Sequence, residues 1–316
     1  MLRIFEMGIN YLTRQKSTNK KEDLLKYKQW LHEKEDKAYL QNYDPAKMSI
    51  PQKILCHAYW HGLFGRKQAF SVKSFLATQD LGKVELWLWL DEDNGYEGYE
   101  KNEWLKPLLP HIKVLSYNPS KRLEGSRFQN QKWIFDQKRR IANRADGLRI
   151  WALHEFGGFY FDLDVMFIKD LTPLFLGDEY LYAWEYQPYA NSAILFLRKG
   201  SYLNEYIWKK VDRCKTTLPW VLFQYKDRKL KHLHVYPCNL FDPFWQAEAK
   251  KELDGMPIAS FEEFFIKSVS SKASVSYRNW FPGAYAYHWH NCWKTEEAEG
   301  SYFSIFEAEF NNFLNK

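Results

Sequence analysis

Apolar residues along the chain fall into segments that predict strands and helices in alternation. Residues 53–60 (KILCHAYW), 84–93 (VELWLWLDED) and 111–117 (HIKVLSY) are rich in β-branched and aromatic residues, as strands usually are. Residues 66–79, between the first two, predict a helix. Because strands that alternate with helices form parallel sheets with crossover connections, the pattern predicts an α/β fold with a mostly parallel sheet flanked by helices.

The N-terminal segment differs in composition from the rest of the chain. Residues 17–43 are rich in Lys and Glu, with apolar residues at helical spacing, and Asp44 and Pro45 end that pattern. We therefore expect an N-terminal helical extension over residues 1–48. No linker or repeat divides the remainder, so residues 50–316 are expected to form one domain.

A second long helix is predicted over residues 133–156. Its apolar stripe consists of Ile141, Ala145, Leu148 and Ala152. Gly157 and Gly158, which tolerate positive φ, end the helix. Asp146 and Arg149 are three residues apart and share one face of it, either as a surface ion pair or as partners of sugar and phosphate oxygens.

The segment after the two glycines, residues 159–168 (FYFDLDVMFI), predicts a strand. Its apolar residues alternate, which places Asp162 and Asp164 together on the opposite face. Two such carboxylates need a compensating cation or hydrogen-bond donors beside them, and oxygen ligands favour Mn²⁺ or Mg²⁺ as the cation. A DxD tripeptide is also common as a solvated pair at a strand end, so both interpretations stay open. Residues 180–186 and 192–198 predict further strands.

Taken together, these residues resemble a known signature. It is carried by Ala145, Asp146, Arg149, Leu153 and residues 157–165 (GGFYFDLDV). The pattern is similar to that of DXD-containing sugar transferases, which include lactosylceramide α1,4-galactosyltransferases, the yeast initiating α1,6-mannosyltransferase, bacterial polysaccharide transferases and, more distantly, the glucosylating clostridial toxins. The resemblance implies a GT-A-like, Rossmann-type fold, retention of anomeric configuration and a divalent cation on the two aspartates.

The resemblance extends to both ends of the expected domain. The segment IPQKILCHAYW is similar to the family's first strand, with one residue inserted, and this places Tyr59 and Trp60 at the nucleotide. Ordinary core packing of the two rings is the alternative. The segment AYAYHWHN is similar to one in which a His closes over the diphosphate, so His288 is expected to be the third metal ligand and Asn291 to lie near the donor. His290 replaces the usual Trp.

Two sets of site residues follow from the resemblance. The expected catalytic residues are Arg149, Asp162, Asp164, Glu185 and Asn191. The expected donor-binding residues are Tyr59, Trp60, Asp146, Arg149, Asp162, His288 and Asn291. Glu185 either faces the anomeric carbon or caps a strand end.

Two other kinds of metal site are not expected. Zinc is not, because neither the HxH pair His288 and His290 nor the pair His232 and His234 has a third ligand at motif spacing. A two-metal hydrolase requires a second carboxylate–His cluster, and the sequence contains no recognisable one.

Composition narrows the class of partners. A net charge of +6 and a pI near 8.8 suit a nucleotide diphosphate or an acidic membrane surface, but are too mild for nucleic acid. The 14 Trp, 21 Tyr and 23 Phe can stack on sugars or bases, although core packing accounts for most of them.

Four cysteines without a CxxC motif favour free thiols in a reducing compartment. No run of about 18 apolar residues predicts a membrane span, which leaves peripheral membrane contact.

The sequence therefore predicts a retaining, metal-dependent glycosyltransferase. It moves a hexose or N-acetylhexosamine from a nucleotide-sugar, with a UDP-sugar favoured, to a glycan, polysaccharide or glycolipid, with Mn²⁺ or Mg²⁺ as cofactor. The alternatives are a protein-modifying glycosyltransferase and a non-catalytic glycan-binding module on the same fold. A cytoplasmic chain of bacterial or viral origin, peripheral at the membrane where its acceptor is lipid-linked, is the favoured setting.

Overall fold

A computed structural model describes residues 53–126, 128–136, 141–269 and 275–314, all of which lie within one compact unit, Tyr43–Lys316. The expected helical extension over residues 1–48 lies outside the described residues. Within the described ranges, no helix is long and apolar enough to cross a membrane. The four cysteines are free thiols, as predicted.

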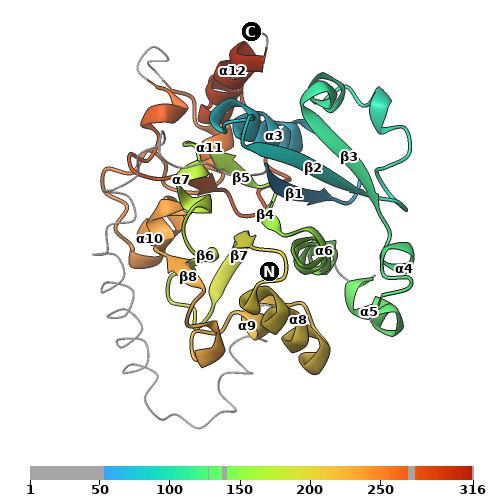
Figure 1. The fold of residues 1–316 in the computed structure, drawn as a ribbon. Helices are drawn as coiled ribbons and strands as arrows, with labels where there is room; N and C mark the ends of the chain where they lie inside the picture. The colour runs from blue at the N-terminus through green and yellow to red at the C-terminus, as the bar shows by residue number, and fades with distance from the viewer. Residues whose placement is uncertain (1–52, 127, 137–140, 270–274, 315–316) are drawn as a thin grey trace. The chain divides into compact units, whose positions relative to one another are not determined.

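A seven-stranded sheet forms the centre of the molecule (Figure 1). Its order is β3-β2-β1-β4-β7-β6-β8, with bounds Ile112–Tyr117, Val84–Asp91, Ile54–Trp60, Gly158–Phe161, Ala190–Leu197, Tyr180–Ala183 and His234–Tyr236. Only β7 is antiparallel to its neighbours. The prediction of a mostly parallel α/β sheet is therefore confirmed. A second sheet pairs β5 (Val165–Phe167) with β9 (Ala286–His288).

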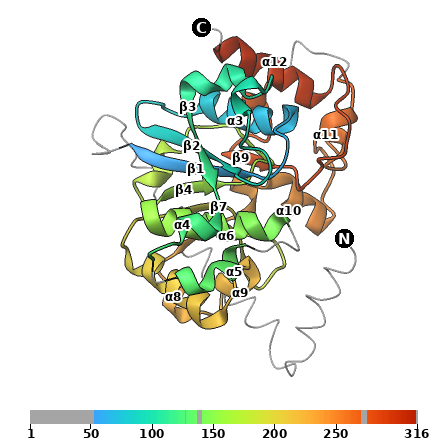
Figure 2. The same cartoon turned by 90° about the vertical axis from the view of Figure 1, so that its right-hand side faces the viewer.

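Helices cover both faces of the large sheet. They are α3 (Arg66–Thr78), α4 (Pro119–Arg122), α5 (Lys132–Phe135), α6 (Ile141–Phe156), α7 (Thr172–Phe175), α8 (Tyr202–Cys214), α9 (Pro219–Leu222), α10 (Pro243–Lys250), α11 (Glu263–Ile266) and α12 (Tyr302–Leu314). Figures 1 and 2 place α3 and α12 on one side of the sheet and α6 and α8 on the other. The order of elements is that of an α/β protein with crossover helices.

The interior is unusually aromatic. The largest fully buried side chains include Trp89, Trp208 and Trp289, and ring contacts such as Phe75 on Phe161, 5.2 Å between centroids, run through the core. Packing thus accounts for much of the aromatic content that the composition leaves open.

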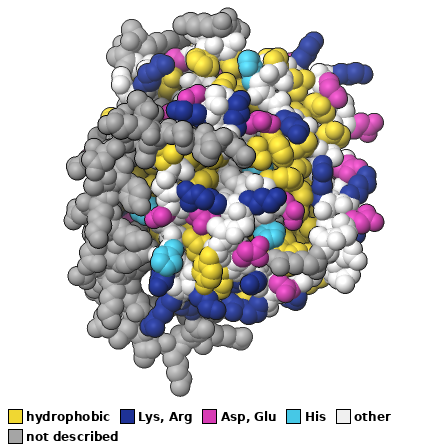
Figure 3. Space-filling model, in the orientation of Figure 1, with side chains coloured by type: hydrophobic (Ala, Val, Ile, Leu, Met, Phe, Trp, Pro, Cys, Tyr) yellow, Lys and Arg dark blue, Asp and Glu magenta, His cyan; other side chains and the backbone are white. Residues whose placement is uncertain are grey.

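On the face drawn in Figure 3, Lys and Arg side chains are interspersed with Asp and Glu side chains, so this face carries no single sign of charge.

The helix predicted over residues 133–156 is two helices, α5 and α6. Ile141, placed on the apolar stripe by its spacing, is 59% exposed. The buried side of α6 instead includes Arg144, Asp146 and Arg149, which find ion-pair partners in the interior. Apolar periodicity thus locates part of the buried face, where Leu148 and Ala152 are fully buried, but misses the part that paired charges occupy.

The strand predicted over residues 159–168 is also wrong as one element. β4 ends at Phe161, the chain turns through residues 162–164, and β5 joins the other sheet. The Asp162 N–H donates to Ala193 O (2.9 Å), and the Val165 N–H donates back to Asp162 O (3.2 Å), which closes the turn. The apolar alternation persists through the turn because residues on both sides of it enter the same buried cluster.

Candidate active site

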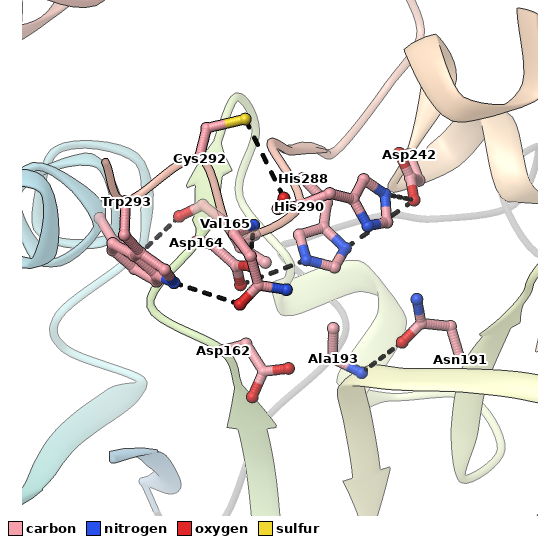
Figure 4. A network of polar contacts seen from close by, with 12 residues as sticks. Asp162, Asp164, Val165, Asn191, Ala193, Asp242, His288, His290, Cys292 and Trp293 are labelled. Atoms are coloured by element: carbon pink, nitrogen blue, oxygen red, sulfur yellow. Dashed lines mark hydrogen bonds and ion pairs between the residues drawn. The ribbon is translucent and has the colours of Figure 1, made fainter. Parts of the chain in front are cut away.

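The turn between β4 and β5 places Asp164 against His288, the last residue of β9 (Figure 4). β5 and β9 pair with Val165 opposite His288, which brings the aspartate next to the imidazole. Asp164 Oδ1 lies 3.2 Å from His288 Nε2, and the Asn291 N–H donates to Oδ2 at 2.9 Å. The structure thus brings together two of the three expected metal ligands, and Asn291 with them.

The Asp164–His288 pair is charged in the metal-free protein. Burial disfavours charge on either group, but their mutual attraction and hydrogen bond outweigh it. As a result the pKa of Asp164 falls to about 2 and that of His288 rises to about 9. A divalent cation can also neutralise this buried carboxylate, if it replaces the proton of the neighbouring imidazolium.

Asp162 is held by Arg149, from the preceding helix. Arg149 Nη2 donates to both Asp162 oxygens, at 2.7 and 3.0 Å, and Tyr160 OH donates to Oδ1 at 2.9 Å. The Asp162 side chain remains 27% exposed, whereas that of Asp164 is buried. Figure 4 shows both carboxylates in the same region as the His288 side chain.

The same guanidinium also binds Asp146. Arg149 Nη1 donates to Asp146 Oδ1 at 2.9 Å and to Ser192 Oγ. Burial, with a contribution from the charge of Asp162, raises the pKa of Asp146 to about 7 despite the nearby Arg149. Asp146 is therefore connected to the DxD turn through Arg149.

Tyr59 and Trp60 lie in different environments. Tyr59 is 4% exposed and donates its hydroxyl to Asp91 Oδ2 (2.7 Å), so its ring is part of the core. The ring of Trp60 packs against that of Trp293 with centroids 4.8 Å apart, and Trp293 Nε1 donates to Asn291 Oδ1 (3.2 Å). Only Trp60 is connected to the region of Asp164.

Glu185 and Asn191 lie on the β6–β7 side of the site. Glu185 follows β6, and its Oε1 is 4.0 Å from Lys250 Nζ in α10. Asn191 Oδ1 accepts from the Ala193 N–H at 2.8 Å, and Figure 4 shows its side chain in the same view as Asp162 and His288.

Asp242 is a site residue that the sequence did not indicate. Its Oδ2 lies 2.6 Å from His290 Nε2 and 3.8 Å from His288 Nδ1, and the three side chains could hold a metal ion. Motif spacing thus did not reveal this potential third ligand of the HxH pair, nor the carboxylate–His cluster that it forms with His288 and His290. Asp242 is 48 positions from His290, so only the fold brings them together.

Residues 86–182 match the family model described as the glycosyltransferase sugar-binding region containing the DXD motif. This part of the chain is therefore a DXD-type glycosyltransferase region. The matched segment contains Asp146, Arg149, Asp162 and Asp164, the residues that form the ion-pair network and the turn. It excludes β1 and the His288 segment, whose likeness to the family rests on sequence resemblance alone.

Several solved glycosyltransferases are distantly similar to this chain. Mouse xyloside xylosyltransferase 1 is 14% identical with a TM-score of 0.44, covering 78% of this chain and 100% of its own. The galactosyltransferase LgtC, solved with donor and acceptor sugar analogues, is 12% identical with a TM-score of 0.43 (83% and 95%). The PaToxG glycosyltransferase is 17% identical with a TM-score of 0.41 (63% and 70%). A comparison with curated protein sequences finds no match.

Proposed function

We propose that the glycosyltransferase is a retaining, Mn²⁺-dependent enzyme that transfers a hexose or N-acetylhexosamine from a UDP-sugar to a glycan, polysaccharide or glycolipid. The observation that carries the proposal is the buried Asp164–His288 pair beside the DxD turn. Residues 50–316 form the catalytic domain in this proposal. A cytoplasmic location, with peripheral membrane contact for a lipid-linked acceptor, belongs to it as well.

The residues present fit a divalent cation. Asp164 supplies a desolvated carboxylate, and His288 presents Nε2 to it at 3.2 Å. Asp162, partly exposed, supplies a further oxygen directly or through water. A carboxylate-rich set with one imidazole suits Mn²⁺ and tolerates Mg²⁺ less well. Such an ion, when bound, offsets the negative charge of a departing nucleoside diphosphate.

The protein's own groups have separate tasks in this proposal. Arg149 fixes Asp162 by donating to both of its oxygens, and Asp146 fixes Arg149. The Asn291 N–H holds Asp164 Oδ2, and the Trp60–Trp293 ring pair forms the side of the site nearest Asn291. Tyr59, which precedes Trp60 in the chain, is anchored in the core by its bond to Asp91.

Retention does not require a dedicated base. In same-face attack, the departing diphosphate can accept the proton of the incoming hydroxyl, so leaving-group stabilisation dominates. Asn191 and Glu185 are assigned to the sugar side of the site, where an amide and a carboxylate can bind hydroxyls of donor and acceptor.

A donor panel tests this proposal. Thermal shift and slow hydrolysis are measured with UDP- and GDP-sugars in Mn²⁺, Mg²⁺ or EDTA, for the wild type and Asp164→Asn. We expect stabilisation and hydrolysis with one UDP-sugar in Mn²⁺, lost in EDTA and in the variant. Near-normal hydrolysis by Asp164→Asn would contradict the metal assignment, and no response to any donor would favour a glycan-binding module. Incubation of the active donor with glycan, lipid and protein fractions then identifies the acceptor class.

A further inference from the structure

His288 has different partners on its two ring nitrogens. Nε2 faces Asp164 Oδ1 at 3.2 Å, while Nδ1 lies 3.0 Å from Tyr182 OH and 3.8 Å from Asp242 Oδ2. A neutral imidazole has one lone pair, so the nitrogen that carries the proton decides which nitrogen can bind a cation. The partners of Nδ1 therefore control what Nε2 can do.

Asp242 places a buried negative charge on the Nδ1 side. Its carboxylate is fully buried, and its Oδ1 has no hydrogen-bond partner among the described residues. Its Oδ2 contacts His290 Nε2 at 2.6 Å. A carboxylate so far from water exerts an electrostatic attraction on nearby N–H groups that solvent screens weakly.

His290 is fixed in place by rings on several sides. Its own ring is parallel to that of Trp184, with centroids 6.2 Å apart, and lies 5.1 Å from Trp245 and 4.8 Å from Phe261. It also stacks on His288 at 3.9 Å. These rings keep His290 against Asp242. Figure 4 shows the Asp242 carboxylate next to both His290 and His288.

The backbone also departs from a regular strand at this point. His290 and Asn291 have φ angles of 48° and 59°, in the left-handed region that non-glycine residues rarely occupy. Two bonds to Asp164 hold this conformation: the Trp289 N–H donates to its carbonyl (3.0 Å) and the Asn291 N–H to its carboxylate (2.9 Å). Strained backbone held in this way is a common feature of functional sites.

We propose that Asp242, held by His290, positions His288 for cation binding. Together with Tyr182 OH, the Asp242 carboxylate keeps the His288 proton on Nδ1 and leaves the Nε2 lone pair directed at the cation beside Asp164. The inference rests on the metal site of the proposed function. With a cation bound, the arrangement would resemble a carboxylate–histidine–metal triad, in which an outer carboxylate orients a metal-binding imidazole; here the carboxylate would act through its charge across 3.8 Å.

A cation bound instead within Asp242, His288 and His290 is the competing arrangement. It would require the lone pair on Nδ1, which already lies within hydrogen-bonding distance of Tyr182, and would turn the Nε2 proton toward Asp164. The 2.6 Å contact between Asp242 and His290 would also have to open to admit the ion. Positioning by Asp242 requires neither change.

Binding of Mn²⁺ alone, followed by electron paramagnetic resonance of the free ion, tests the inference. We expect Asp242→Asn to weaken Mn²⁺ binding about 10- to 100-fold, the usual loss when an outer partner of a metal ligand is removed, and Asp164→Asn to abolish it. Asp227→Asn is the matched control. It removes a different carboxylate, 15% exposed, which pairs with Lys210 at 2.6 Å, and should bind Mn²⁺ like the wild type.

The position of the proton gives an independent readout. In protein labelled with ¹⁵N-histidine and loaded with diamagnetic Mg²⁺, the His288 signal, identified by its absence in His288→Gln, should report a proton on Nδ1. Asp242→Asn should move that population toward the tautomer with the proton on Nε2. If Asp242→Asn proves unstable at the assay temperature, Tyr182→Phe keeps the ring, removes only the acceptor for Nδ1 and should shift the tautomer in the same direction.

The outcomes separate the inference from the proposed function. Wild-type affinity in Asp242→Asn overturns the positioning role while leaving the metal site intact. Complete loss of binding in Asp242→Asn, together with an Nε2 proton in the loaded wild type, also overturns it, because Asp242 is then a direct ligand. If the wild type binds no Mn²⁺, the metal site of the proposed function fails and the inference fails with it.

Discussion

Arg149 is the residue on which the geometry of the DxD turn depends most. Its two terminal nitrogens serve different carboxylates, Asp146 and Asp162, and its guanidinium lies 4.6 Å from the centre of the Tyr160 ring. A planar guanidinium can donate in two directions at once and stack on a ring, whereas an ammonium group cannot do both in a fixed geometry. The same side chain therefore stabilises the interior and orients a proposed metal ligand.

Substitution of Arg149 should separate these effects. Arg149→Leu leaves Asp146 and Asp162 without their shared cation and should lower the free energy of unfolding by about 3–5 kcal/mol. Arg149→Lys keeps the charge and should lose less stability, yet it should impair Mn²⁺-dependent donor hydrolysis because one ammonium cannot hold both carboxylates. Urea unfolding and hydrolysis assays measure the two quantities. Equal stability in the two variants, or full activity in Arg149→Lys, would contradict this view.

His288 makes cation binding depend on pH. Its pKa near 9 in the metal-free protein means that it carries a proton at pH 7 that the cation must displace from Nε2. As the pH rises toward that pKa, Mn²⁺ affinity should therefore increase about tenfold per pH unit, and binding should release about one proton. Calorimetric titrations at pH 7 in two buffers of different ionisation enthalpy measure the proton count. In His288→Gln the remaining binding should release none; release unchanged from the wild type would assign the proton elsewhere.

At the scale of elements, the passage from α6 into β4 sets where the DxD turn begins. Gly158 has a φ of 104°, and a Cβ at this position would lie 2.0 Å from Leu55 O in the neighbouring strand β1. The close approach lets β4 pair beside β1 immediately after the helix ends. Any side chain here would push the two strands apart.

Gly158→Ala should therefore be severely destabilising, by about 3 kcal/mol or more, because backbone strain and a clash with a carbonyl combine. Gly255 provides the control, since it also has a positive φ (79°) but no atom within 4 Å of where a Cβ would lie. Gly255→Ala should cost only the strain, about 1–2 kcal/mol. Chemical denaturation measures both, and similar losses in the two variants would mean that the contact with Leu55 has no effect.

Elements that depend on interactions between residues close in the sequence were predicted correctly, whereas those that depend on distant residues were not. β1, β2, β3 and α3 were predictable because each is encoded by a local run of residues. The break after Phe161 was not, since Asp162 is turned by a bond to Ala193 on β7 and the apolar alternation continues through it.

The residues of the site fall into the same two groups, those close together in the sequence and those that only the fold brings together. Asp162, Asp164 and Arg149 lie close in sequence and form a recognisable signature. Asp242 meets His290 across 48 positions, and only the sheet topology reveals their contact. Tyr59 is placed at the nucleotide by family resemblance, but its hydroxyl is directed to Asp91 in the interior. Pairings between polar groups that are far apart in the sequence could thus not be predicted from it.

At the scale of the whole molecule, α3 connects the site to the C-terminal helix. Ser71 Oγ donates to Val165 O (2.6 Å), and Ser74 Oγ accepts from the Phe167 N–H (3.0 Å), so α3 supports β5 directly. On the same helix, Lys73 contacts Glu307 of α12 at 2.9 Å. The strand that follows Asp164 and the helix α12 are thus joined through one helix.

Glu307 is the ionic centre of that connection. It accepts from Arg66 at 2.7 Å as well as from Lys73, and only 7% of its side chain is exposed. Glu307→Gln leaves both cations without this counter-charge and should lower the free energy of unfolding by about 2–4 kcal/mol, less than a fully buried pair because Arg66 is partly solvated. Lys215→Ala, which breaks an exposed pair with Asp212, should cost less than about 1 kcal/mol.

Loss of Glu307 should act on stability and not on the site. The bonds from Ser71 and Ser74 to β5 do not involve Glu307, so they persist as long as α3 remains folded. Below its unfolding transition, Glu307→Gln should therefore bind Mn²⁺ within about twofold of the wild type, since a change of about 1.4 kcal/mol would already be tenfold. Thermal unfolding combined with Mn²⁺ titration at low temperature measures both properties. A large loss of Mn²⁺ affinity in the folded variant would instead show that α12 controls the geometry of Asp164 through α3.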